Sequence, residues 1–452
     1  MIRDDTIHVR CVDISYEGKG VCKSGNDVYF VPSMFPGEEG DIVLSYTRNG
    51  AKFGKLVHLD AVSPDRVEPM CKICSSCGGC QFQQYAYGKQ LEWKAKNVKE
   101  QFRKIAKMDV AVNPCIGMDE PYFYRNKIQM PIGKDKKGQI ISGFFKSGTH
   151  DIVPVGTCYI EDRRSEGILQ SIKGLMKSMR IDPYDEDKRT GIVRHILIRT
   201  SFYRKEVMVV LVTSVDSFPG RGNLIKALVK SNPEITTIVQ NINSRQTNVI
   251  LGEKERILYG PGFIRDSLCG IEFKISAKSF YQTNPLMTEK LYEYAIKAGK
   301  IDGNCIVFDA YSGIGTIGLI ASKKAREVLS VELVKEAVSD GRRNAERNGI
   351  TNFRMFCDDA STFMMNMASE GRKVDVLFMD PPRKGSDERF LEAVLKLRPS
   401  RVVYVSCDPS TLARDIKILA PSYRIESVQP FDMFPHTAHV ETVCLMSRVE
   451  GK

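Results

Sequence analysis

The fold is decided by RVVYVSCDPSTLARD, residues 401–415, because this stretch passes from strand to helix within a few positions. Residues 402–405 form a short apolar, β-branched run, which is typical of a buried strand. Asp408 is a favourable N-cap, and Pro409 fits the first position of the helix that follows. Cys407 therefore lies at the carboxyl end of a strand, where open α/β sheets place their ligands. A helix N-terminus favours the thiolate form of a nearby thiol, so we interpret Cys407 as a nucleophile rather than as a buried structural cysteine.

The same alternation of strand and helix begins at about residue 263 and predicts a parallel, doubly wound α/β sheet. Residues 304–309 (NCIVFD) form a strand, and the next residues turn through Gly313 and Gly315 into a helix. The following strand ends in Glu332, nineteen positions beyond Gly313, near the offset of about 20 residues at which an acid binds ribose hydroxyls. The sequence has no second glycine pair for a pyrophosphate and no lysine loop for ATP. It therefore favours an adenosine without phosphates, and S-adenosylmethionine is the candidate.

Further acids follow the later strands. Asp358 and Asp359 end the third strand, where a carboxylate can meet an adenine amino group. Asp380 follows the fourth strand and is held by two prolines, so it is a rigid acceptor for the edge of a planar substrate. Glu441, in DMFPHTAHVETV, would alone be an exposed strand residue. With a thiolate and an adenosine site at the same sheet edge, it becomes a candidate general base.

The composition and the N-terminal region point to an RNA partner. The 452 residues carry a net charge of +11, which suggests a polyanionic partner, and their number indicates about three domains. Residues 1–62 hold four strand-like runs between glycine turns, which predicts either an OB-like barrel that binds RNA or a generic β-domain. An apolar leader and an apolar run of about 18 residues are both missing, so we expect a cytoplasmic protein with no membrane association.

Four of the thirteen cysteines lie in MCKICSSCGGCQF. Cys71, Cys77 and Cys80 have the spacing C-x5-C-x2-C, and Cys74 lies within the first gap. Thiolates this close together indicate a metal, because disulfides are disfavoured in the cytoplasm. Four local cysteines can complete a structural zinc site. An iron–sulfur cluster with a remote fourth cysteine is equally compatible with the spacing.

The middle of the chain reads as an α+β domain. Residues 84–107 predict a long basic helix, including Lys94, whose charged face either follows phosphates or is simply solvated. Residues 121–160 and 190–260 give strands, and the first of these segments sets aromatic side chains beside Arg125. Such pairs can stack bases and hold phosphates, although core packing is the usual role of a single aromatic residue.

Several motifs together resemble the bacterial RNA (uracil-5-)-methyltransferases: SCDPSTLARD, DPPRKG, FYQTN (280–284), DAYSGIGT and DMFPHTAHVETV. The resemblance extends through C-x5-CGGC, YRNK and FPGEEGD, and so over essentially the whole chain. It looks most like the branch acting on 23S ribosomal RNA, because the transfer-RNA branch resembles a shorter chain without the barrel and the cysteines. It implies a TRAM-type barrel at 1–62, a central iron–sulfur and RNA-binding domain at 63–262 and a Rossmann-like methyltransferase domain at 263–452. We expect the helix, continued to about residue 112, to pack on the catalytic domain.

The resemblance also implies roles for individual residues. It implies a [4Fe–4S] cluster whose ligands are Cys71, Cys77, Cys80 and Cys158, with an exchange of ligands left open by Cys74. We expect S-adenosylmethionine to be held by residues of the FYQTN segment, the glycine turn and the strand ends: Gln282, Tyr311, Gly313, Thr316, Glu332, Asp359 and Asp380. Two positions depart from the family pattern, since Asp408 replaces the usual asparagine and Ser312 the usual cysteine.

The implied chemistry follows from the target atom. C5 of uracil is too weak a nucleophile to accept a methyl group directly, so we expect Cys407 to add at C6 first. Glu441 would then remove the C5 proton, and Asp380 and Gln282 would orient the uracil and the cofactor. The target base must leave its stack to reach these groups. The alternatives are methylation of transfer RNA or of a small molecule, and an iron–sulfur RNA-binding protein without catalysis. A radical S-adenosylmethionine enzyme would need the spacing C-x3-C-x2-C, which these cysteines do not show. We infer no obligate protein partner.

Overall fold

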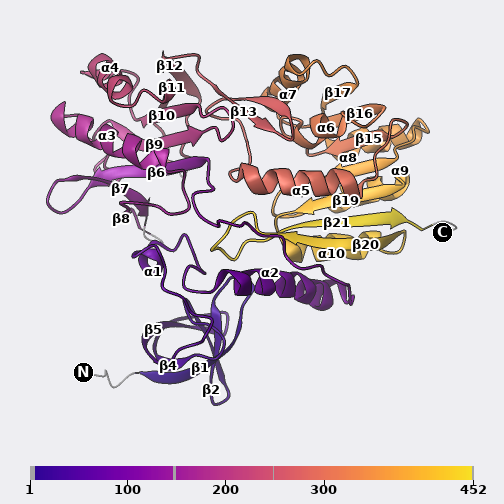
Figure 1. Ribbon diagram of the computed structural model, residues 1–452, viewed down its shortest axis with the longest axis horizontal. Coiled ribbons are helices and arrows are strands. Elements are labelled where there is room, and N and C mark those ends of the chain that lie inside the picture. The colour runs from indigo at the N-terminus through magenta and orange to yellow at the C-terminus, as the bar shows by residue number, and fades with distance from the viewer. Residues whose placement is uncertain (1–5, 146–148, 248, 450–452) are drawn as a thin grey trace. The chain divides into compact units, whose positions relative to one another are not determined.

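A computed structural model describes residues 6–145, 149–247 and 249–449 (Figure 1). By their internal contacts these residues form two compact units. Unit 1 contains the chain up to Pro121 together with Cys407–Ala413 and Gln429–Thr442. Unit 2 contains Tyr122–Ser406, Arg414–Val428 and the chain from Val443 onward. Each unit is therefore assembled from segments that are far apart in the sequence.

The N-terminal part of unit 1 is a closed five-stranded barrel with the order β1-β2-β3-β5-β4. Its strands are β1 (Ile7–Ile14), β2 (Gly20–Ser24), β3 (Asp27–Val31), β4 (Glu39–Arg48) and β5 (Ala51–Ala61). Alternate side chains point inward, and the barrel core includes Val9, Tyr29 and Ile42. The predicted barrel is thus confirmed. The sequence pattern missed only β2, which is short and follows a glycine turn.

The rest of unit 1 contains a short helix α1 (Cys74–Cys77), the long helix α2 (Tyr87–Gln101) and a π-helical turn η1 (Phe102–Ala106). The predicted helix therefore forms, but its basic residues do not all face solvent. The Lys94 side chain is fully buried and forms an ion pair with the equally buried Asp432. The prediction of a uniformly exposed basic face is wrong at this position, because the partner of Lys94 lies 338 positions later in the chain.

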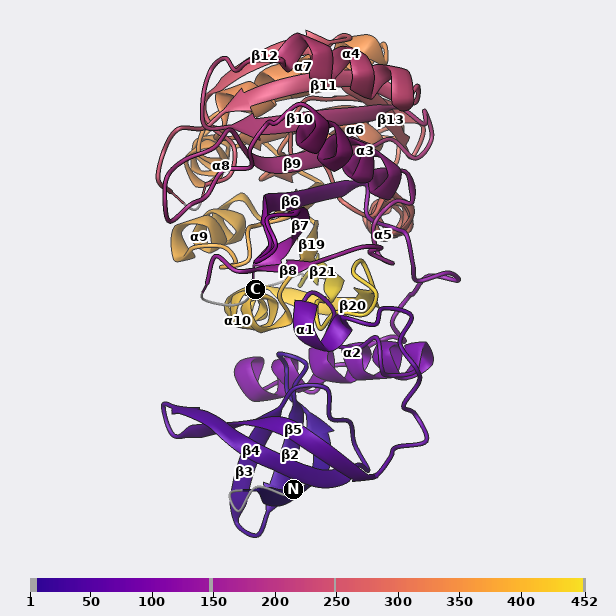
Figure 2. The ribbon, with the colours of Figure 1, turned by 90° about the vertical axis from the view of Figure 1, so that its left-hand side faces the viewer.

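Unit 2 begins with a seven-stranded sheet of order β12-β11-β10-β9-β6-β7-β8. Its strands are β6 (Lys127–Lys134), β7 (Ile140–Phe145), β8 (Ile152–Pro154), β9 (Val193–Thr200), β10 (Val207–Thr213), β11 (Ile235–Ile242) and β12 (Lys254–Tyr259). Every residue of β9 and β10 is buried, as expected for central strands. Helices α3 (Arg164–Ser178) and α4 (Arg221–Ser231) lie side by side against the sheet (Figure 2).

The second large sheet has the order β17-β16-β15-β18-β19-β21-β20. A two-stranded hairpin, β13 (Ile264–Leu268) and β14 (Ile271–Ile275), precedes it. The strands are β15 (Ile306–Ala310), β16 (Glu327–Glu332), β17 (Phe353–Cys357), β18 (Val376–Met379), β19 (Arg401–Ser406), β20 (Tyr423–Phe431) and β21 (Glu441–Arg448). The helices of this part are α5 (Pro285–Ala298), α6 (Thr316–Ala321), α7 (Lys335–Arg347), α8 (Ala360–Ser369), α9 (Glu388–Leu397) and α10 (Pro409–Leu419).

Strands β15 to β19 are parallel, which confirms the predicted doubly wound sheet. The chain first adds β16 and β17 on one side of β15 and then β18 and β19 on the other. The order of strands thus reverses between β15 and β18. Ligands of open α/β sheets bind outside the carboxyl ends of the strands at such a reversal.

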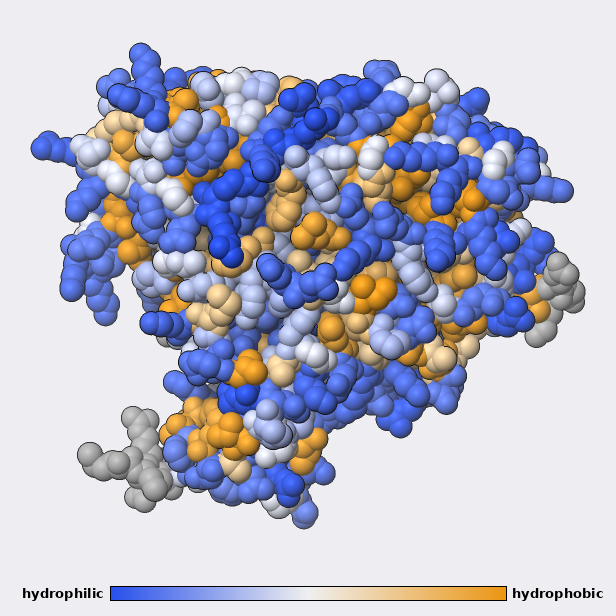
Figure 3. All heavy atoms as spheres, viewed as in Figure 1, coloured by the Kyte–Doolittle hydropathy of each residue, from blue (hydrophilic) through white to orange (hydrophobic). Residues whose placement is uncertain are grey.

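The surface in the view of Figure 3 is mostly hydrophilic, with apolar residues in scattered groups. Among the described residues, no helix combines the length and the apolar character that a bilayer span requires.

Candidate active site

The turn between β15 and α6 is shaped by left-handed backbone conformations. Tyr311 has φ 59°, Gly313 φ 57° and Gly315 φ 77°. The following helix packs tightly on the sheet at Gly318, where an added Cβ would lie 2.4 Å from the Ser330 Oγ. Only glycine fits that position, so α6 lies directly against the sheet beside the end of β15.

Glu332, the last residue of β16, is fixed against this turn. Its Oε2 accepts a hydrogen bond from the Gly313 N–H at 2.9 Å, and its Oε1 accepts one from the Val334 N–H at 2.9 Å. The carboxylate therefore keeps one orientation, with lone pairs left for a ligand. The structure thus brings Gly313 and Glu332 together, and the role of Glu332 toward a ribose stays a prediction.

Two further carboxyl groups at the same strand ends have raised pKa values. Burial raises the pKa of Asp309 to about 7, and the neighbouring carboxylates Asp380 and Glu332 add to the rise. Asp309 accepts hydrogen bonds from the Gly318 N–H at 3.0 Å and the Ser330 hydroxyl at 3.1 Å. The protein packed around Asp380, directly after β18, also raises the pKa of its carboxyl to about 7. An edge this rich in carboxyl groups suits a cationic ligand, and the sulfonium of S-adenosylmethionine is one.

Three further residues are predicted to bind the cofactor: Tyr311, Thr316 and Asp359. The Tyr311 ring packs on Phe390 with 4.8 Å between the ring centroids, and burial raises the pKa of its hydroxyl. Thr316 is the first residue of α6. Asp359 caps α8, because its Oδ1 accepts from the Thr362 N–H at 2.9 Å and from the Thr362 hydroxyl at 2.8 Å. One oxygen of Asp359 is thus committed to the helix, and a ligand would have to use the other.

The segment that carries Gln282 is held by residues of the central sheet region. The Asn126 side chain donates to the Gln282 carbonyl at 3.0 Å, and the Arg199 guanidinium donates to the Ser279 carbonyl at 2.5 Å. The hydroxyls of Tyr281 and Thr283, on either side of Gln282, are buried without a hydrogen-bond partner among the described residues. Such groups are rare in proteins unless a ligand or water satisfies them. The segment therefore fits a polar ligand such as the predicted cofactor.

Within unit 2, Asp415 fixes the end of β19 that leads to Cys407. This fully buried carboxylate accepts from the Tyr404 hydroxyl at 2.7 Å and from the Ser386 N–H at 2.8 Å. It thereby joins β19, α10 and the loop that follows Asp380. β18 and β19 are neighbours in the sheet, with Met379 opposite Tyr404.

Cys407 itself is half-buried and precedes a capped helix. The Oδ1 of Asp408 accepts from the Ser410 N–H at 2.8 Å and from the Thr411 N–H at 3.4 Å. The predicted N-cap is therefore confirmed. An aspartate can replace the family's usual asparagine here because the capping function needs only the side-chain oxygen.

The segment before Glu441 is fixed by α2 and by the residues after the cysteines. The Phe82 N–H donates to the His436 carbonyl at 2.9 Å, and the Ala438 N–H donates to the Gln81 side chain at 3.3 Å. Gln90 of α2 accepts from the His436 N–H at 3.0 Å. Burial lowers the pKa of His436 to about 4, so this imidazole is neutral at pH 7. Glu441, three residues after Ala438, is the first residue of β21.

The cysteine stretch of unit 1 holds its thiols near one another. Burial raises the pKa of the Cys80 thiol to about 11, and the thiols of Cys71, Cys74 and Cys77 add to the rise. The Gln83 amide bridges the stretch, since it accepts from the Cys71 N–H at 3.2 Å and donates to the Cys80 Sγ at 3.4 Å.

Four thiols within ten residues are compatible with a structural zinc site as well as with an iron–sulfur site. Cys158 belongs to unit 2, where Glu161 lies three residues later and burial raises the pKa of the Glu161 carboxyl to about 8. The donor set remains one of thiols, as an iron–sulfur cluster requires.

Comparisons with known proteins agree with this geometry. The profile of the tRNA (uracil-5-)-methyltransferase family matches residues 235–449. An uncharacterized RNA methyltransferase of Halalkalibacterium halodurans is 40% identical over 446 residues, which cover 98% of this chain and 97% of the relative. Another from Staphylococcus aureus is 39% identical over 437 residues, which cover 96% of both chains.

A solved structure aligns over nearly the full length as well. The Pyrococcus abyssi tRNA (uracil-54, C5)-methyltransferase in complex with S-adenosyl-L-homocysteine is 27% identical, with a TM-score of 0.78. The alignment covers 97% of this chain and 100% of that one. The expectation that transfer-RNA enzymes are shorter and lack the barrel is therefore wrong for this relative. On these similarities, the chain belongs to the S-adenosylmethionine-dependent RNA (uracil-5-)-methyltransferase family.

Proposed function

We propose that this enzyme methylates C5 of uridine in 23S ribosomal RNA through a covalent bond between Cys407 and C6 of the uracil. The observation that carries the proposal is the place of Cys407 in the sheet. It directly follows β19 and precedes a capped helix, while Asp380 directly follows the neighbouring parallel strand β18. A thiol at a helix N-terminus is favoured as thiolate, which is the form that attacks.

The chain's own groups would act in sequence on the uracil ring. The Cys407 thiolate forms a bond to C6, and the electron pair of the C5–C6 double bond moves onto the O4 side as an enolate. A group with a pKa near 7, such as Asp380, can hydrogen-bond the ring in either protonation state and hold it in place. S-adenosylmethionine supplies the electrophilic methyl group. Gln282, Tyr311 and Glu332 would hold and orient that cofactor beside C5.

Glu441 would complete the reaction. Once C5 carries both the methyl group and its original proton, the Glu441 carboxylate removes that proton, the C5–C6 double bond re-forms and the Cys407 thiolate leaves. The position of Glu441 supports this role, because the residues just before it are bound to Gln81, Phe82 and Gln90. A general base on such a fixed support needs little reorganisation to act.

We also propose that a [4Fe–4S] cluster is held by Cys71, Cys77, Cys80 and Cys158. Its role would be structural. The residues directly after Cys80 bind the segment that leads to Glu441, so a cluster that fixes this loop also fixes the base. The extra thiol of Cys74 lies in the same stretch, where it is buried.

The choice between ribosomal and transfer RNA rests on different observations. The full set of motifs resembles the ribosomal branch, whereas the solved relative named above acts on transfer RNA. Transfer RNA is therefore the second candidate substrate. Both substrates require the same chemistry at Cys407.

The test incubates the purified enzyme and labelled S-adenosylmethionine with unmodified 23S RNA or transfer RNA and analyses the nucleosides by mass spectrometry. We expect 5-methyluridine in 23S RNA, loss of the product in Cys407→Ala, and full activity in Cys357→Ala, which removes an exposed cysteine of the same sheet. In RNA with 5-fluorouracil the C5 proton is replaced by fluorine, so the wild-type protein should remain covalently attached. Product in transfer RNA alone would overturn the ribosomal substrate, and full activity of Cys407→Ala would overturn the mechanism.

A further inference from the structure

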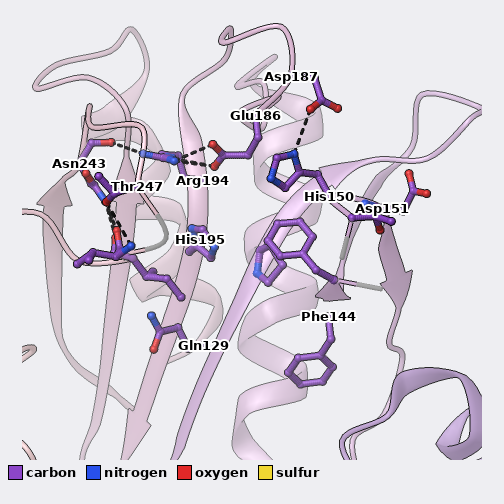
Figure 4. A pocket seen from close by; sticks show the side chains of 15 residues that line it. Gln129, Phe144, His150, Asp151, Glu186, Asp187, Arg194, His195, Asn243 and Thr247 are labelled. Atoms are coloured by element: carbon purple, nitrogen blue, oxygen red, sulfur yellow. Dashed lines mark hydrogen bonds and ion pairs between the residues drawn. The ribbon is translucent and has the colours of Figure 1, made fainter. Parts of the chain in front are cut away.

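A second site lies on the central sheet of unit 2. A cavity of about 850 Å³ opens between β6, β7, β9 and the loops that carry Glu186 and Asn243 (Figure 4). Its size is in the range of small-molecule and nucleotide sites. None of its lining residues belongs to the cofactor-binding or catalytic set described above.

One wall of the cavity is rigid. Arg194 is only 5% exposed, and its guanidinium forms a two-pronged ion pair with Glu186 at 2.7 to 2.9 Å. Its Nη1 also donates to the Asn243 carbonyl at 2.9 Å and to the Arg245 carbonyl at 2.7 Å. Arg194 is thus fully engaged and its charge is compensated. It shapes the wall and is not available to bind a phosphate.

Aromatic rings form a second wall. The ring of Phe145 lies 5.8 Å from that of His150 and 6.4 Å from that of His195, with edge-on geometry in both pairs. Phe144 also lines the cavity (Figure 4). Flat rings at a cavity wall are the usual platform for an unstacked base.

Several polar side chains that line the cavity can form further hydrogen bonds. His195 is 7% exposed, and its Nδ1 has no hydrogen-bond partner among the described residues. Burial lowers the pKa of His195 to about 4, so at pH 7 the neutral ring offers one N–H and one lone pair. The Gln129 amide on β6 and the Asp151 carboxylate also line the cavity, and neither has a side-chain partner among the described residues.

The charges and hydrogen-bonding groups that line the cavity determine which ligand it can bind. Asp151 is an unpaired acceptor, while Arg194 is paired with Glu186 and His150 with Asp187. Among the lining residues that the structure describes, none is an unpaired cation that could bind a phosphate. The cavity offers aromatic rings, two side chains that can both donate and accept hydrogen bonds (His195 and Gln129), and the Asp151 carboxylate. Together these groups match the edge of a base that carries an exocyclic amino group.

We propose that this cavity binds a second, unstacked nucleobase of the RNA substrate, distinct from the uridine that is methylated. Phe145 would stack on the base, and His195 and Gln129 would hydrogen-bond its edge while the phosphates stay outside. An adenine, guanine or cytosine fits the carboxylate better than uracil does. The site would then select the RNA by the position of an amino-bearing base relative to the target. This inference rests on the proposed function, because it takes RNA to be the substrate.

The first test compares Phe145→Ala and Gln129→Leu with Gln139→Leu, which changes an exposed glutamine of the neighbouring β6–β7 turn. Phe145 is itself partly exposed, so its truncation does not open the core. Loss of one stacked base weakens binding roughly 5- to 150-fold. We expect such a rise in the KM for RNA in both cavity variants, with kcat at saturating RNA and the affinity for S-adenosylmethionine unchanged. The control should behave as wild type.

The second test locates the base. Single abasic substitutions are placed at unpaired nucleotides around the target uridine, and binding to wild type and to Phe145→Ala is measured. We expect one position other than the target at which the abasic RNA binds wild type more weakly but binds Phe145→Ala no more weakly than intact RNA does. Cavity variants that bind and methylate like Gln139→Leu would refute the second base while leaving the methyltransferase intact. RNA binding that shows this pattern without any 5-methyluridine would refute the proposed function alone.

Discussion

The buried ion pair between Lys94 and Asp432 gives the sharpest test of how unit 1 is held together. Both side chains are 0% exposed, and Asp432 also accepts from the Tyr87 hydroxyl at 2.9 Å. In Lys94→Met the aliphatic stem is retained, but the carboxylate is left buried with one neutral donor. Removing one partner of a buried pair costs about 3–5 kcal/mol. We therefore expect the free energy of unfolding of unit 1 to fall by that amount.

The matched control is Lys89→Met on the same helix. Lys89 forms an ion pair with Glu92 at 2.8 Å, but the two side chains are 40% and 67% exposed. Exposed pairs contribute only about 0–1 kcal/mol. The double variant Lys94→Met/Asp432→Leu removes both buried charges and should recover much of the lost stability, because no uncompensated charge remains.

The measurement is thermal unfolding by circular dichroism, together with methylation of RNA. A loss of about 3–5 kcal/mol corresponds to a first transition lower by roughly 6–20 °C. Methylation should fall as well, since Asp432 lies in the segment that leads to Glu441. Equal small losses in Lys94→Met and Lys89→Met would show that the buried pair does not hold this segment.

Three further outcomes follow from the site. Glu441→Gln should accumulate a covalent protein–RNA adduct that already carries the methyl group, with kcat lower by roughly 10²–10⁴-fold; denaturing gels that show no adduct would remove Glu441 from the proton step. The pKa of Asp309 is about 7 in the folded protein and about 3.9 in the unfolded chain, so the folded state binds more protons and stability falls as pH rises from about 4 to about 7. Asp309→Asn should reduce the slope of that part of the pH dependence in urea unfolding, with Asp380 still contributing to it, and an unchanged slope would contradict the assignment. Cys80→Ser should lower the iron content and kcat together while S-adenosylmethionine still binds, and full activity without iron would remove the structural role of the cluster.

The parts of this molecule that the sequence predicts are those with local signals. The barrel and the parallel sheet follow from apolar runs, turns and caps, and the acids at strand ends such as Glu332 stand out because their neighbours define the strands. The position of Lys94 could not be predicted, since a lysine in a basic helix looks solvated until its partner 338 residues away is known. The cavity was missed for the same reason. His195 and Gln129 read as ordinary strand residues, and only the pairing of β6 with β9 makes them neighbours.

The discontinuity of unit 1 has a consequence for the synthesis of the protein. A ribosome releases the cysteine stretch and α2 long before residues 429–442 exist, yet Phe82 and Lys94 find their partners only in that late segment. Until that segment is made, the Lys94 ammonium has no carboxylate partner, and the loop that carries the four cysteines is not yet held in its final position. The proposed iron–sulfur cluster would then be loaded after translation ends, and a chain that stops before residue 430 would lack the partners of Phe82 and Lys94.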